Sequence, residues 1–164
     1  SAAVEVNLKH GFEVVVLANT DSLVAELIST RIQAFIKTGF YEPVRALETN
    51  FAYKFYKEKR KAEFYKNFKA AYVSSGYTQF IGRTINELGM QLLRTKSWQE
   101  AFDIFDYLVS IFPKAPQAYD SLAYAFLSKG NSDKAYETFK KALNINKSFN
   151  SDYIKDNYGH GSED

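Results

Sequence analysis

The chain has 164 residues, of which 46% are hydrophobic and 16% aromatic, so it can bury a core and is not a disordered polymer. A net charge of +2 does not by itself indicate a nucleic-acid partner, and the lack of cysteine excludes a disulfide framework and a Cys-based zinc site. The longest strongly apolar run, Val14 to Ala18, is far shorter than the roughly 20 residues that span a bilayer.

Residues 1–20 alternate in hydrophobicity around a turn that contains Gly11, which predicts a β-hairpin. The alternating apolar residues are Val4, Val6 and Leu8, then Phe12, Val14, Val16 and Ala18. Val15 and Leu17 make the second strand apolar on both sides, as in strands inside a sheet. Because a lone two-stranded hairpin is marginal in water, we expect it to need further strands.

Three helices are predicted between the hairpin and residue 76. The first, from about 23 to 37, follows capping residues at 19–22, would lie on the hairpin, and ends near Gly39 and Pro43. The second follows Pro43, with Val44, Leu47, Phe51 and Phe55 at helical spacing. The third runs from about 59 to 73 with an aromatic side, and residues 74–76 end it.

A 34-residue pattern is written twice in register between residues 82 and 149. Its first copy holds Ile85, Leu88, Gly89, Leu92, Ala101, Phe105, Leu108 and Pro113. Its second copy holds Tyr119, Leu122, Ala123, Phe126, Ala135, Phe139, Ala142 and Lys147. Such a period marks stacked helix-turn-helix units, here with helices near 83–95, 98–111, 117–129 and 132–145. The pattern resembles the tetratricopeptide repeat (TPR), a module that binds or positions other molecules.

Two repeats are fewer than the three normally needed to bury a continuous core, so the aromatic helices between 43 and 73 should close the stack. A last segment, Ser148 to Tyr158, is predicted to add a capping helix. The predicted fold is mainly α: a TPR-like array with flanking helices, preceded by a β-hairpin and helix. The predicted divisions are 1–39, then 40–158 with repeats at 82–115 and 116–149, then a tail at 159–164.

The stretch from His10 to Asp21, with its Val-Val-Val-Leu-Ala-Asn core, and the helix that runs to Phe35 resemble the carboxyl end of a serine β-lactamase-like hydrolase of the class C and penicillin-binding type. Residues 86–93 and 119–122 resemble a carboxyl-terminal repeat of the form NxLGxxLL…YDSL. Some bacterial hydrolases carry this repeat. The resemblance implies an accessory domain of a bacterial, periplasmic or secreted enzyme. Since the first residue is Ser and no leader precedes it, we expect the chain to be a piece of something longer.

Catalysis in that family needs a nucleophilic Ser with a Lys one helical turn away, and no Ser-x-x-Lys occurs in the chain. Lys37-Thr38-Gly39 and Tyr65-x-Asn67 spell two other motifs of the family but in the wrong order and place, so we interpret them as chance matches. The chain itself is therefore predicted to be non-catalytic.

In TPR arrays the first helix of each repeat lines a concave face. The corresponding residues here are Asn86, Met90, Leu93, Asp120, Tyr124 and Leu127. The basic clamp that holds a peptide carboxylate in some members is absent, and Asp120 would repel such a group. The face therefore suits an apolar or aromatic segment of a protein partner. Alternatively, it packs within the chain against the flanking helices.

Three further patterns in the sequence bear on binding or catalysis. Residues 54–69 hold seven basic residues among aromatic ones, which fits either a nucleic-acid patch or an amphipathic helix pair with its rings inward. His10 and His160 have no companions at ligand spacing, so neither a metal nor a cofactor is predicted. Asp103 and Asp106, three residues apart on a helix, are interpreted as outward surface charge.

The best interpretation is a non-catalytic protein-interaction or accessory domain of a serine hydrolase. One alternative is an independent scaffold that forms a homodimer through its hairpin, and a second is a basic aromatic nucleic-acid binder.

Overall fold

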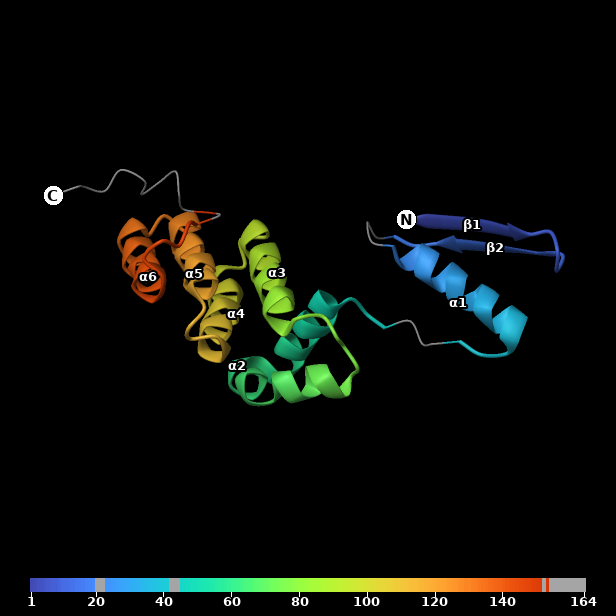
Figure 1. Ribbon diagram of the computed structural model, residues 1–164, viewed down its shortest axis with the longest axis horizontal. Coiled ribbons are helices and arrows are strands. Elements are labelled where there is room, and N and C mark those ends of the chain that lie inside the picture. The colour runs from blue at the N-terminus through green and yellow to red at the C-terminus, as the bar shows by residue number, and fades with distance from the viewer. Residues whose placement is uncertain (20–22, 42–44, 152, 154–164) are drawn as a thin grey trace. The chain divides into compact units, whose positions relative to one another are not determined.

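The computed structural model describes residues 1–19, 23–41, 45–151 and 153, and it divides into two compact units, Ser1–Ala46 and Leu47–Asp164 (Figure 1). The described residues form six helices and an amino-terminal two-stranded antiparallel hairpin. The predicted fold class, mainly α with a hairpin and helix in front, is confirmed.

In the first unit, β1 (Ala2–Asn7) pairs with β2 (Phe12–Leu17), with Val4 opposite Val15. Leu8, predicted in the first strand, lies instead in the connecting turn, where Gly11 adopts a left-handed conformation (φ 66°). Helix α1 (Val24–Thr38) lies along one face of the hairpin, as predicted (Figure 1). Ala3, Val14 and Ala25 are buried there.

The first unit leaves much apolar surface exposed. Val15 and Leu17 are 57% and 79% exposed on the hairpin face opposite to that of Val14, and Val4 and Val6 share that face. On α1, Leu27, Phe35 and Ile36 are also exposed. Strand β2 is therefore apolar on both faces. Among the described residues of this unit, nothing covers its outer face.

The second unit begins with α2 (Glu48–Ser74), which contains a sharp kink at Arg60 (φ 60°, ψ 170°). The kink separates the two helices that the sequence predicts over this stretch. Leu47 precedes the helix rather than forming part of it, and Val44 lies outside the described residues. The buried side of α2 carries aromatic rings, with Phe64, Phe68 and Tyr72 almost fully inaccessible.

The two repeats form α3 (Ile81–Arg94), α4 (Trp98–Ile111), α5 (Pro116–Ser128) and α6 (Ser132–Ile145), each packed against the next (Figure 1). Every boundary lies within two residues of its predicted position. Helix α2 packs on α3 and closes that end of the stack, as predicted. Of the predicted helix over 148–158, residues 148–151 are not helical, and most of the remainder lies outside the described residues.

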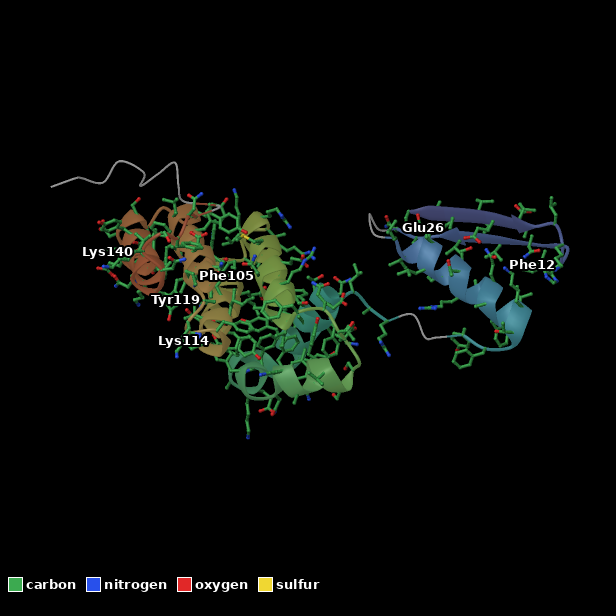
Figure 2. The ribbon with its side chains drawn as sticks, viewed as in Figure 1. Phe12, Glu26, Phe105, Lys114, Tyr119 and Lys140 are labelled. Carbon is green, nitrogen blue, oxygen red and sulfur yellow. The ribbon has the colours of Figure 1, made fainter. Side chains whose placement is uncertain are left out.

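The crossing of α3 and α4 depends on the missing side chain of Gly89. A Cβ atom added there would lie 2.5 Å from the ring of Phe105, which is fully buried (Figure 2). The matching position of the second repeat holds Ala123, which is also fully buried. Small residues therefore set how closely the two helices of each repeat approach.

A buried carboxylate fastens the kinked α2 to α4. Asp103 accepts hydrogen bonds from the Tyr56 hydroxyl (2.7 Å), Lys61 Nζ (2.8 Å) and Gln99 Nε2 (3.1 Å). The Tyr65 hydroxyl donates to the Asp103 backbone carbonyl at 2.6 Å. The prediction that Asp103 faces outward is wrong, because the turn of the chain at Arg60 brings Tyr56 and Lys61, from the two halves of α2, onto the Asp103 side chain.

The electrostatics of this carboxylate follow from its donors. Burial alone would raise the pKa of Asp103, but the hydrogen bonds from Lys61, Tyr56 and Gln99 outweigh it and hold that pKa below its ordinary value. Burial, with the nearby carboxylate, raises the pKa of the Tyr56 hydroxyl. Asp103 is therefore ionised and Tyr56 neutral at physiological pH, which suits a structural tie.

Gly89→Ala is expected to lower the free energy of unfolding by about 1–3 kcal/mol, because the new methyl group overlaps the Phe105 ring. Urea denaturation measures this change. Gln91→Ala, at an exposed position of the same helix, serves as the matched control and should change stability by less than about 0.5 kcal/mol. A Gly89→Ala variant as stable as the wild type would contradict the close crossing.

Asp103→Asn is expected to cost about 2 kcal/mol at pH 7, because it removes the charge that three donors share. The folded pKa of Asp103 lies below its unfolded value of about 3.9, so the stabilisation is complete above that value and disappears as the pH falls through the folded pKa. Urea denaturation should show that the difference in free energy of unfolding between wild type and variant is smaller at pH 3 than at pH 7.

Asp106→Asn is the control for this prediction, since Asp106 lies three residues along the same helix with an exposed side chain. Its effect at pH 7 should be small. If the two substitutions changed the free energy of unfolding equally, or if the effect of Asp103→Asn did not depend on pH, the Asp103 carboxylate would not be the group that holds α2 on α4.

Candidate functional site

Two neighbouring hollows lie along the first helices of the repeats, and together they are called the groove below. The first, of about 410 Å³, is lined by residues of α3, α4 and α5, among them Asn86 and Asp120, and by Phe80 and Phe112, which lie just before α3 and just after α4. The second, of about 550 Å³, lies between α3 and the start of α2 and includes Thr49, Met90 and Arg94. Asn86 and Tyr153 line both hollows.

The structure separates the six predicted concave-face residues into three groups. Asn86, Met90 and Asp120 line the groove. Tyr124 is half-buried beside it, with its ring against that of Tyr153. Leu93 is instead buried in the helical core, and Leu127 is half-buried and lines neither hollow.

Asn86 has an amide oxygen that the described residues leave unsatisfied. Its Oδ1 atom is buried and has no hydrogen-bond partner among them. A buried oxygen of this kind typically costs about 1–3 kcal/mol until a donor reaches it. Because the residue lies where the two hollows meet, a backbone N–H of a bound segment could supply that donor.

The charged residues around the groove do not form a carboxylate clamp. Its described lining contains Arg83 and Arg94 but no lysine, and Arg83 Nε is paired with Glu87 at 2.8 Å. Glu48 and Asp120 add negative charge to the same walls. The surface is therefore better suited to an apolar or aromatic segment with hydrogen-bond donors than to a free terminal carboxylate.

The carboxyl-terminal segment of the chain already occupies part of the groove. The Ser151 hydroxyl donates to Asp120 Oδ1 at 2.5 Å, and the Tyr153 ring stacks on Tyr124 with centroids 5.0 Å apart and planes at 26°. Sequence reasoning missed Ser151 and Tyr153, since neither belongs to the repeat pattern. The only sequence signal was an aromatic residue within a polar stretch that follows the last repeat.

The basic segment 54–69 offers no stacking surface. Its rings turn inward: Phe64 and Phe68 are fully buried, Tyr56 is 9% exposed, and Phe55 and Tyr65 are packed against the core. Lys57 and Lys61 are paired with Glu100 and Asp103. Of the rings on which the nucleic-acid alternative depends, Tyr56, Phe64 and Phe68 are therefore buried, and Phe55 and Tyr65 are partly buried.

Within the described ranges, no group of three or more His, Asp or Glu side chains could hold a metal ion, and His160 lies outside these ranges. In the same part of the chain, no helix has the length and apolar character to cross a membrane.

Among known proteins, no protein-family model and no curated protein matches the chain.

Proposed function

We propose that residues 47–153 form a non-catalytic protein-interaction module that binds an extended segment of a partner protein in the groove, as an accessory domain of a serine hydrolase. The observation that carries the binding role is the buried, unpartnered Oδ1 of Asn86 at the junction of the two hollows. Helical repeats of this period ordinarily present such a surface.

The walls of the groove define the ligand that fits it. Phe80 and Phe112 form an aromatic pair at one end, with centroids 5.1 Å apart, and Phe80 is 65% exposed. Met90, a flexible and polarisable side chain, lines the other hollow. An extended segment with apolar or aromatic side chains would bury these groups, while its backbone would satisfy Asn86.

Peptides selected from a random displayed library on the immobilised chain should be rich in apolar and aromatic residues. Fluorescence anisotropy of a labelled selected peptide should show at least tenfold weaker binding to Asn86→Ala and to Met90→Lys, because the first removes the hydrogen bond and the second places a charge in the hollow. Lys140→Ala, exposed on α6, is the control and should bind as the wild type does (Figure 2). Peptides indifferent to both groove variants would contradict the proposed site.

A second element of the proposal concerns the first unit. Its hairpin consists of two strands, each paired on one side only among the described residues, and its outer face and α1 both expose large apolar side chains. Unpaired strand edges and apolar faces of this kind invite pairing or packing. We propose that the unit completes the sheet of the parent hydrolase, which would be a bacterial enzyme of the periplasm or the exterior. The alternative occupant is a second copy of the chain.

The gene tests this assignment. We expect its reading frame to continue upstream of Ser1 through a region that contains Ser-x-x-Lys, the nucleophile and base that this chain lacks. A start codon directly before Ser1 would count against the hydrolase. The alternative of a second copy would then predict a dimer, which light scattering would detect. Val15→Lys should dissociate that dimer, whereas the control Lys9→Ala, in the turn, should not.

A further inference from the structure

The described residues of the carboxyl-terminal segment, 149–151 and 153, contact α5 and α6 at three points. Phe149 packs on Phe139 of α6, with ring centroids 6.4 Å apart. Ser151 reaches Asp120, and Tyr153 reaches Tyr124. The backbone N–H of Tyr153 also donates to Ser151 Oγ at 3.0 Å, which holds the two contact residues in one conformation.

The contacts with α5 and α6 are made by side chains, as in the recognition of a peptide by a helical groove. Asp120 is only 2% exposed and Ser151 is 5% exposed, so the hydrogen bond between them is shielded from water. Tyr153 at the same time forms a wall of both hollows. The segment therefore covers the surface that the proposed function assigns to a partner.

We propose that residues 149–153 are an internal ligand of the groove, and that the partner displaces them with the same chemistry: a hydroxyl residue for Asp120, followed two positions later by an aromatic residue for Tyr124. This inference rests on the proposed function and names both its partner class and its regulation. A tethered segment competes at an effective concentration on the order of millimolar. The apparent affinity for a partner therefore falls in proportion to the fraction of molecules in which the groove is free of the segment.

The chemistry also defines what the groove rejects. A carboxylate in the position of the Ser151 hydroxyl would face the Asp120 carboxylate, and like charges in a shielded site repel strongly. An aliphatic residue in the position of Tyr153 would lose the ring contact with Tyr124. A Ser-x-Tyr or Thr-x-Tyr segment thus satisfies the site, whereas an Asp-x-Tyr segment does not.

Met90 provides a direct reporter, because it is the only methionine of the chain and lines the same hollow as Tyr153. In the full chain with a ¹³C-labelled methionine methyl group, Ser151→Ala with Tyr153→Ala should shift this single NMR signal by removing the neighbouring ring. The probe is the amidated peptide Lys-Ser-Phe-Asn-Ser-Asp-Tyr, a copy of residues 147–153. Added to the double variant, it should return the signal toward its wild-type position.

The wild type should need at least tenfold more of this peptide for any response, since its own segment competes. A peptide with Asp in place of the Ser151 equivalent should fail on both proteins. Ser151→Ala alone is the milder variant, and circular dichroism checks that both variants keep their helices. An unmoved Met90 signal in the variants, or equal response of wild type and double variant to the peptide, would overturn the inference.

The two proposals fail in different ways. If library-selected peptides bind the wild type and the double variant equally and still depend on Asn86, the groove binds partners but the segment is not its internal ligand. If those peptides ignore Asn86 while Tyr153 still controls the Met90 signal, the segment docks but the groove is not the partner site.

Discussion

A stack of two helical repeats leaves an apolar face at each end, and the way the chain covers those faces organises the second unit. At one end α2 supplies a row of rings, in which Phe64 stacks on Phe68 with centroids 4.5 Å apart and meets Tyr107 of α4. At the other end Phe149 packs on Phe139 of α6. Because the repeats cannot bury these faces alone, both flanking segments become part of the fold.

Polar contacts with a buried aspartate hold each of these flanking segments in place. Helix α2 must bend at Arg60 to follow the stack, and the Asp103 carboxylate holds its two halves through Tyr56 and Lys61. The carboxyl-terminal segment uses a second buried aspartate, Asp120, with the Ser151 hydroxyl as donor. The second of these ties involves Asp120, a groove residue, so the segment that packs on α6 also contacts the candidate groove.

Much of the architecture could be predicted from local pattern. The spacing of Leu88, Gly89, Ala101 and Phe105 indicated the close crossing of α3 and α4, and the structure shows the Phe105 ring where a Cβ of residue 89 would lie. The candidate groove residues followed from position within the repeat alone. That reasoning placed Asn86 and Met90 on the groove, but it also included Leu93, which the core buries. The repeat period alone could not separate Leu93 from the groove residues. Successive residues of a helix are rotated by about 100°, so a small rotation of the helix decides which side chains face solvent.

The misplacement of Asp103 has a different cause. On its own helix it resembles Asp106, a polar residue three positions away, and nothing local distinguishes the two. Their difference arises from residues 38 to 47 positions distant, which lie on both sides of the kink in α2.

The sequence by itself determined the helices, the repeat register, the hairpin and the lack of a Ser-x-x-Lys pair, since each depends on residues close together in the chain. Only the tertiary structure decided which carboxylates are buried, which rings of residues 54–69 are hidden, and that Ser151 and Tyr153 occupy the groove. Those features depend on contacts between segments distant in sequence, whose geometry is set by how the helices pack and not by any local pattern.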